Sequence, residues 1–584
     1  MIIEEGTPVV RAAAARPRWP VVVVTAVAAL AVAIGAVAGA FLVGGRGAGA
    51  GVGGAASYVP ADAFMYLELR LDLPGDQRAM LRGVLDRFGD LNPDTVLGAE
   101  LGKTLDDAVA KSQAPFRYTT DVAPWFNGQL AVAMNDYPSA ADPAKMTFPS
   151  TVAFLGLRDA TAATALADRL RAELQKRGSQ FTSEMHGATQ VWSLVADASA
   201  GTMQPGFAYA VTPDHLLLGS GTASVTTALD VHAGTRAALA GRDDLARLAS
   251  RLPTDRVGFF AVDYAPVWKQ LRAGAERTSP GLGKLFDTFA TATPGLVVGA
   301  ARFEADRLVF TSLSDAPTGT FAAANSQRSL ARWIPGDAIL VSEGGSFGPK
   351  LEQAVIALKA GMGVSGPSSQ QIAQAEAALG GKLESYVSWI GDGALVAGWA
   401  GGQPYGGLVL VPTDVAAARQ RLGQLAALAT LGAGQAGGIR VSHQTVAGVD
   451  VTTFRSGAAA GGSMPVDGFA PSVVLQYAVT EQRVLIGLGD QFVGRALELQ
   501  EADSLAASQR YLSALNEVGG TNNAGSTFVD LAALRTAIET AIPAASKAEY
   551  AQRIQPYVAP FDYLVGVARV VDGRLEQRAA IVVK

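Results

Sequence analysis

The chain has 584 residues, with 47 Lys and Arg against 52 Asp and Glu, and therefore a net charge of −5 at neutral pH. That sign excludes the usual electrostatic footprint of a protein that binds nucleic acid or an anionic lipid surface. The sequence holds no cysteine, which excludes disulfides, haem thioethers, thiolate metal sites and a lipoprotein anchor.

The first element along the chain is an uncharged segment from Trp19 to Gly45. Its apolar part, Pro20–Val43, would be about 36 Å long as an α-helix, enough to cross a hydrocarbon core of about 30 Å. More arginines precede the segment than follow it, so the positive-inside rule keeps the N-terminus in the cytoplasm. We expect a cytoplasmic N-terminus at residues 1–18, a transmembrane helix at 19–45 and a Gly/Ala-rich tether at 46–56. The localisation that follows is a single-pass protein of a bacterial plasma membrane, with the C-terminal bulk outside the cytoplasm.

A cleaved signal peptide is the alternative for this segment, since Ala36–Ala40 offers small-residue cleavage sites. The apolar region of a signal peptide usually has about 7–15 residues, and this one is longer. Gly35-x-x-x-Gly39 matches a helix-packing motif, which is common by chance in Ala/Gly-rich spans. A second uncharged stretch, Gly393–Thr413, contains glycines and a proline at its middle, which predicts two buried strands joined by a turn.

The rest of the chain carries an internal duplication, the feature to seek before any other. Tyr209-Ala-Val-Thr212 recurs as Tyr477-Ala-Val-Thr480, and Gly299-Ala-Ala-Arg302 recurs as Gly566-Val-Ala-Arg569. Other matches follow in the same order in both halves. We therefore predict two repeats, at residues 57–318 and 319–584, in agreement with a length above the ~250–300 residues at which a single core stops growing.

Each repeat has the same predicted order of elements, and its hairpins mixed with helices indicate an α+β fold. We expect a tandem-duplicated ectodomain of mainly antiparallel sheets with helices packed on one face. Segments 361–371 and 457–463 are predicted to be loops. The main predicted elements are a strand (Ala63–Leu69; Ala338–Glu343), a helix (Asp76–Phe88; Lys350–Ala360), an Ala-rich helix (Ala160–Leu174; Val415–Ala429), a later helix (Thr222–Val231; Gln491–Leu499) and a closing hairpin (Leu296–Leu313; its turn at Val571–Gly573 in the second repeat).

Polar residues shared by the two repeats are the first candidates for a site. Asp263 and Asp530 each end a strand and open a helix, where a carboxylate caps free backbone N–H groups. Arg302 and Arg569 lie in the closing hairpins, where a structural ion pair is expected. Neither pair indicates acid–base chemistry.

The four histidines, His186, His215, His232 and His443, show no metal-ligand spacing and do not align between the repeats. We assign no catalytic, cofactor-binding or metal-binding residue and expect no cofactor. Ser220 and Ser342 lie in no nucleophile elbow.

Two further patterns have ordinary structural explanations. Gly344–Lys350 superficially resembles a phosphate loop, but Pro349 removes a donor and no Ser or Thr follows the lysine. The carboxylate pairs Asp106-Asp107 and Asp243-Asp244 are predicted to be solvated or capping residues at helix surfaces.

Three segments carry a resemblance to a known group: Tyr58–Asp62 (Tyr-Val-Pro-Ala-Asp), Leu67–Gln77 (Leu-Glu-Leu-Arg-Leu-Asp-Leu-Pro-Gly-Asp-Gln) and Val122–Gly128 (Val-Ala-Pro-Trp-Phe-Asn-Gly). On these motifs the chain resembles the bacterial family catalogued as domain of unknown function 3352, typically membrane-anchored proteins with a large exported region. The resemblance implies the anchored topology, and it implies no activity, cofactor or catalytic residue.

The function expected from these observations is a non-catalytic binding or scaffold module of the cell envelope, of uncharacterised activity. Its predicted partners are the plasma membrane through one helix and an extracytoplasmic protein, lipid or glycan, with no nucleic acid. An apolar ligand is one possibility, and the groove between the repeats is a natural place for a ligand. The alternative is an extracytoplasmic hydrolase whose site assembles only in three dimensions, in which a histidine would meet a serine and a carboxylate.

Overall fold

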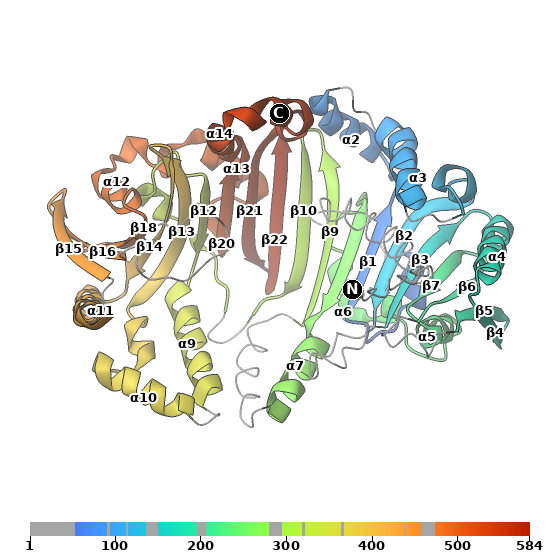
Figure 1. Ribbon diagram of the computed structural model, residues 1–584, viewed down its shortest axis with the longest axis horizontal. Helices are drawn as coiled ribbons and strands as arrows, with labels where there is room; N and C mark the ends of the chain where they lie inside the picture. The colour runs from blue at the N-terminus through green and yellow to red at the C-terminus, as the bar shows by residue number, and fades with distance from the viewer. Residues whose placement is uncertain are drawn as a thin grey trace, which may run out of the picture.

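A single antiparallel sheet of 20 strands runs through the whole of the computed structural model (Figure 1). The structure describes residues 53–89, 91, 94–111, 115–135, 150–195, 206–278, 295–317, 322–363, 367–436, 439–456 and 474–584. A separate two-stranded ladder pairs β11 (Ser326–Gln327) with β19 (Asn522–Asn523). Every strand pairing of the large sheet among these residues is antiparallel.

The pairings arrange the strands in two sets of ten with the same internal order. From one edge to the centre the first set is β4 (Phe181–His186), β5 (Thr189–Leu194), β6 (Ala208–Val211), β7 (His215–Gly219), β3 (Thr151–Leu157), β2 (Phe126–Met134), β1 (Met65–Arg70), β8 (Gly258–Asp263), β9 (Leu296–Glu304) and β10 (Arg307–Asp315). From the other edge the second set is β15 (Ile439–Val446), β16 (Val449–Ser456), β17 (Val474–Val479), β18 (Val484–Leu488), β14 (Gln403–Pro412), β13 (Ile390–Ala400), β12 (Leu340–Gly344), β20 (Gly525–Asp530), β21 (Phe561–Val571) and β22 (Arg574–Val583).

The two sets join at the centre, where β10 pairs with β22. Thr311 lies opposite Arg578 in this pair, and the residues on either side of them match by pseudo-two-fold symmetry. Phe310 lies opposite Ala579, and Ser312 lies opposite Gln577. Figure 1 shows the two strands side by side in the middle of the elongated molecule.

Helices cover both faces of the sheet. We call the face that carries Val309 and Leu313 of β10 face A, and the opposite face, which carries Leu308 and Phe310, face B. In β2, β9 and β14 alternate side chains enter the cores on the two faces, because successive residues of a strand point to opposite sides. On face A lie α5 (Thr222–His232), α6 (Asp243–Ala249), α12 (Phe492–Glu498) and α13 (Gln509–Val518); on face B lie α2 (Gln77–Leu85), α4 (Ala160–Lys176), α9 (Phe347–Gly363) and α11 (Val415–Ala436).

Buried carboxylates at equivalent places hold the segment that leads into each half. Glu68, 1 % exposed, accepts hydrogen bonds from Gly53 N at 3.1 Å and from Tyr66 Oη at 2.8 Å. Glu343, 3 % exposed, accepts the backbone N–H of Ser329 at 3.0 Å and of Leu330 at 3.2 Å. The buried polar groups therefore satisfy backbone donors, as burial requires.

The expected fold class is wrong in its architecture. One continuous sheet replaces the separate sheets of the two repeats, and helices cover both faces instead of one. In the described part of the chain, no helix is long and apolar enough to span a membrane, and the segment 19–45, where we expected such a helix, lies outside the described residues. The repeat boundaries at 57–318 and 319–584 stay predictions.

Of the local predictions, one is confirmed, one is wrong and one lies outside the described residues. The stretch Gly393–Thr413 does form two strands, β13 and β14, with Gly401 and Gly402 at positive φ in the turn between them. The loop predicted at 361–371 is wrong, because α9 continues to Gly363 and α10 begins at Pro367. Proline is well suited to the first position of a helix, where its missing N–H costs nothing. The predicted loop at 457–463 lies outside the described residues.

Candidate functional site

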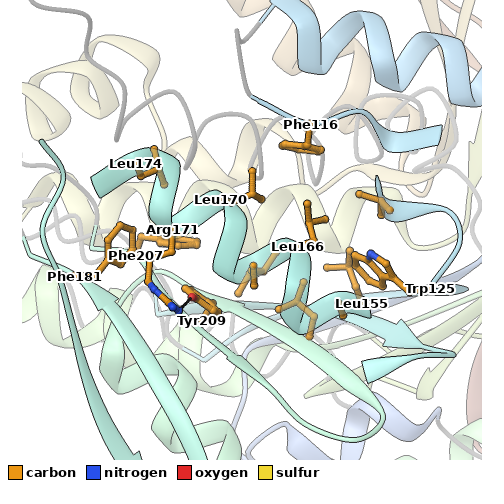
Figure 2. Close-up of a pocket in the computed structure, with 15 residues that line it drawn as sticks. Phe116, Trp125, Leu155, Leu166, Leu170, Arg171, Leu174, Phe181, Phe207 and Tyr209 are labelled. Atoms are coloured by element: carbon orange, nitrogen blue, oxygen red, sulfur yellow. Dashed lines mark hydrogen bonds between the residues drawn. The ribbon is translucent and has the colours of Figure 1, made fainter. Parts of the chain in front are cut away.

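An apolar pocket of about 90 Å³ lies between α4 and face B of the sheet, and we call it the α4 pocket (Figure 2). Its inner wall is the sheet, and its outer wall is the helix. Thirteen of its fifteen lining residues are apolar, and the two exceptions are Arg171 and Tyr209. The apolar residues are Phe116, Val122, Trp125, Leu155, Ala163, Leu166, Ala167, Leu170, Leu174, Phe181, Phe207, Leu216 and Leu218.

Local sequence places the helix over the sheet. Asp159 caps α4, accepting the N–H of Ala162 at 3.0 Å, and the apolar residues Leu166, Leu170 and Leu174 turn one side of the helix inward. The small Ala163 and Ala167 lie on that inner side and leave space above the strands. Trp125 closes one end of the pocket, and its indole N–H donates to Asp121 O at 2.6 Å.

The rim of the pocket is only partly buried. Phe116, Phe181, Phe207 and Leu170 pack against the core of this region without being fully covered. Figure 2 shows Phe116 and Leu170 on one side of the space and Phe181 and Phe207 toward its far end. A ligand would therefore enter between aromatic side chains, a lining typical of small-molecule sites.

The polar end of the pocket is a fixed arrangement around Arg171. The Nη1 atom of Arg171 donates to Tyr209 Oη at 2.7 Å and lies 2.8 Å from Asp168 Oδ1. Its guanidinium carbon lies 3.5 Å from the ring centroid of Trp192, which pairs with Tyr209 across strands β5 and β6. A cation stacked on a tryptophan and bound by a carboxylate is held in one orientation.

Tyr209 carries a hydroxyl group beside the polar end of the pocket. Burial raises the pKa of its phenol to about 12, although the nearby Arg171 acts in the opposite direction, so the hydroxyl keeps its proton at neutral pH. Its oxygen accepts from Arg171, and within the described part of the chain its own proton is donated to no other group. A phenol can donate and accept at once. The walls of the pocket are almost wholly apolar, and the Tyr209 hydroxyl lies beside its polar end, next to Arg171.

The same place in the second half carries a larger side chain. The α11 helix is capped by Asp414, which accepts the N–H of Ala417 at 2.9 Å, as Asp159 caps α4. Counting from the two caps, Leu422 takes the position of Ala167, and Ala426 takes that of Arg171. Leu422 is 9 % exposed and belongs to the core beneath α11. A leucine that joins the core therefore stands in the second half at the position where the first half has an alanine that lines the pocket.

The histidines do not form a catalytic group. His186 contacts Asp230 at 2.7 Å on the surface, and His443 contacts Thr452 at 3.2 Å. His232 stacks on Tyr58 with ring centroids 3.9 Å apart, and His215 is buried beside Asp214, with 3.1 Å between Nδ1 and Oδ2. None of the four, all in the described part of the chain, hydrogen-bonds a serine.

The serines and the remaining carboxylates have structural contacts. Ser220 Oγ accepts the N–H of Thr151 at 3.0 Å, and Ser342 hydrogen-bonds Thr527 at 3.0 Å. Asp106 binds Thr119, and Asp244 pairs with Arg242. Nowhere in the described ranges do three or more His, Asp or Glu side chains gather in a way that would hold a metal ion.

The capping role predicted for Asp263 and Asp530 is confirmed. Asp263 accepts the N–H of Ala265 at 3.0 Å, and Asp530 accepts that of Ala533 at 2.8 Å. Both also bind an arginine of the preceding helical segment, Arg242 at 2.7 Å for Asp263 and Arg510 at 3.1 Å for Asp530.

Of the two arginines of the closing hairpins, only Arg302 shows the predicted ion pair. It lies 3.6 Å from Asp255 and 2.7 Å from Glu304. Arg569 packs beside Gly519, and within the described residues it has no ion pair.

The loop Gly344–Lys350 is not an anion cradle. Asp392 accepts the N–H of Ser346 at 2.8 Å, so a carboxylate already occupies the place where a phosphate would need free donors. Lys350 Nζ donates to Gly345 O at 3.0 Å, inside the same loop. Gly348 packs directly against Ile390, which leaves no space for a ligand.

Sequence reasoning missed the α4 pocket. Its lining consists of the apolar residues that any amphipathic helix puts on a sheet. The sequence feature that could have indicated the pocket is a difference between the two Ala-rich helices, which carry Ala167 and Leu422 at equivalent positions. We had instead looked for polar residues shared by the two repeats.

Comparison with known proteins gives one match. A family model described as "Protein of unknown function (DUF3352)" matches residues 23–571. No curated protein and no solved structure matches the chain. Since the family model covers nearly the whole sequence, the chain belongs to the DUF3352 family, as the motifs around Tyr58, Leu67 and Val122 indicate.

Proposed function

We propose that this protein is a non-catalytic binding protein whose α4 pocket takes the end of a straight-chain lipid bearing a carboxyl or ester oxygen. The observation that supports this proposal most directly is an apolar space between α4 and the sheet, with the Tyr209 hydroxyl and Arg171 beside one end of it. An apolar cavity excludes water, so an alkyl chain gains the hydrophobic free energy of transfer on entering it.

The chemistry of the polar end narrows the ligand class. A ligand oxygen that accepts from Tyr209 would also lie near the Arg171 guanidinium, which favours a carboxylate or carbonyl over an amine. Asp168 neutralises part of that positive charge, so the site does not require a full negative charge. A phenol that stays protonated suits both forms of ligand.

The test is a titration of the purified full-length chain with cis-parinaric acid, a straight-chain fatty acid that fluoresces in apolar surroundings. We expect saturable enhancement that palmitic acid reverses. Ala167→Leu, which copies the second half, should weaken binding at least tenfold by filling the pocket. Tyr209→Phe should weaken it about threefold to tenfold, since a net hydrogen bond contributes about 0.5–1.5 kcal/mol.

The matched control is Ala165→Leu, the same substitution at an exposed position of the same helix. It should bind the probe like the original chain. Exposed leucines elsewhere, such as Leu395 and Leu488, offer non-specific sites for a fatty acid, and probe bound there would be insensitive to Ala167→Leu. Absence of saturable binding, or equal binding by the two leucine variants, would refute the proposal.

A further inference from the structure

A second space, of about 430 Å³, lies on face B over the centre of the sheet, and we call it the central groove. Strands β8 and β10 of the first half and β12, β20, β21 and β22 of the second half line it. In Figure 1 the ribbons of β10, β21 and β22 run through the middle of the molecule at this place. The groove therefore spans the pseudo-two-fold axis, where the two halves meet.

Its floor is made of residues with almost no side chain. Ala579 lies opposite Gly566, and Ala568 lies opposite Gly525, in neighbouring strands. Small side chains at adjacent register positions form a shallow trough across β20, β21 and β22. A flat ligand can lie close to the backbone there.

One side of the trough is aromatic. Phe260 lies directly over Gly299 of the next strand, since a Cβ built on that glycine would come within 2.2 Å of the Phe260 Cε1 atom. The ring thus covers the glycine and lines the groove. Phe310, from β10, lines the same side. Aromatic faces bind the C–H groups of a ligand that lies flat on them.

The other side of the trough is polar and neutral. Ser342 and Thr527 share a hydrogen bond of 3.0 Å, and Ser312 donates to Gln577 Oε1 at 3.4 Å, which leaves the exposed Gln577 amide N–H₂ for a ligand. Glu343 also borders the groove, but its carboxylate is turned to backbone N–H groups of the segment before β12.

Arg578, the other charged residue that borders the groove, belongs to face A. It lies opposite Thr311, and its guanidinium pairs with Glu304 at 3.3 Å. The groove therefore presents hydroxyl and amide groups without a net charge.

The two sides correspond by the pseudo-symmetry. Because Gly299 of β9 matches Gly566 of β21, Phe260 matches Thr527, and Phe310 matches Gln577. The same two positions are thus aromatic in the first half and hydrogen-bonding in the second. That difference produces a groove with one apolar and one polar side.

From this arrangement we infer that the central groove binds a neutral oligosaccharide. A sugar ring has C–H faces that pack on phenyl rings and an edge of hydroxyl groups that pair with serine, threonine and glutamine. An alkyl chain would leave those polar groups unpaired, which costs free energy. A charged ligand would find no opposite charge in the groove.

The experiment is saturation-transfer difference NMR of the full chain with N,N′,N″-triacetylchitotriose, and cellotriose in parallel. We expect a saturable signal from the ring C–H protons of at least one of these neutral sugars. Gln577→Phe, which copies the first-half residue, should reduce the affinity at least tenfold by filling the polar side. Gln577 is exposed, so this variant should fold normally, which a thermal unfolding curve checks.

Two controls separate the possible outcomes. Gln420→Phe, at an exposed position of α11, should leave sugar binding unchanged, and so should Ala167→Leu, because the α4 pocket is a different site. If the α4 pocket does not bind a fatty acid, sugar binding in the central groove is unaffected, because the two sites share no lining residue. Lack of signal from both sugars, or equal signals from the Gln577→Phe and Gln420→Phe variants, would overturn the inference.

Discussion

A reciprocal exchange between the two halves tests whether the α4 pocket is empty space. Ala167→Leu places in α4 the side chain that α11 carries, and Leu422→Ala places in α11 the side chain that α4 carries. If the two helices sit over the sheet in the same way, the first change fills a cavity and the second creates one. The two variants should then change stability in opposite directions.

The magnitude follows from the cavity. Surrounding structure loses about 24 cal/mol for each Å³ left empty, so about 90 Å³ amounts to about 2 kcal/mol if it were filled completely. A leucine fills part of the space and meets some strain, so we expect Ala167→Leu to raise the free energy of unfolding by about 1 kcal/mol. Leu422 is 9 % exposed, and its truncation should cost about 2–4 kcal/mol.

The assay is urea unfolding followed by tryptophan fluorescence, to which both halves contribute, Trp125 at the end of the pocket in the first half and Trp389 beneath α11 in the second. Ala165→Leu should lie within about 0.5 kcal/mol of the original chain, as exposed substitutions usually do. A loss of stability from Ala167→Leu would show that the pocket is too narrow for the side chain. Little or no loss from Leu422→Ala would show that the second half is not filled as described.

Three further predictions concern buried charge. Burial lowers the pKa of His215 from 6.5, so the folded state resists protonation and its stability falls as the pH drops below about 6.5. In His215→Gln the midpoint of thermal unfolding should therefore depend less on pH between about pH 5 and 7. Burial raises the pKa of Glu343 above 4.5, so the folded state holds the proton more tightly and its stability falls as the pH rises from 4.5. Over that range the midpoint of thermal unfolding of Glu343→Gln should rise relative to that of the original chain. Arg510→Met removes the 2.7 Å partner of Asp562, which is 5 % exposed, but Lys584 still lies 2.5 Å from the other carboxylate oxygen, so the change should cost about 1 kcal/mol in urea unfolding. Adding Lys584→Met should leave the buried carboxylate without a cation and raise the loss to about 3 kcal/mol.

Local sequence predicted turns and helix starts correctly where a single residue type determines the backbone conformation. Asp572-Gly573 predicted the turn between β21 and β22, and both residues have positive φ, at 49° and 72°. Asp263 before α7 (Tyr264–Thr278) and Asp530 before α14 (Leu531–Ala541) predicted helix starts, because a carboxylate there satisfies free backbone N–H groups. The order of strands and helices within each half followed from such signals.

The continuous sheet could not be predicted in this way. The pair that joins the halves, β10 with β22, is held by backbone hydrogen bonds that any strand can make at its edge. The side chains of β10 would alternate in the same way if that edge were exposed or covered by a helix. The edge that a strand offers to a distant partner depends on the packing of the whole chain. The residue types of Thr311 and Arg578, which lie opposite each other, do not indicate that the two strands pair.

Both sites that we propose lie where the halves differ, and this follows from how the fold is maintained. Equivalent positions that hold the sheet together, such as the buried carboxylates Glu68 and Glu343, must keep their contacts in both halves. Positions outside those contacts are free to change separately. Ala167, where the second half has Leu422, lines the α4 pocket, and Phe260 against Thr527 gives the central groove its two unlike sides. A repeated frame thus supplies rigidity, while its departures from symmetry supply binding surfaces.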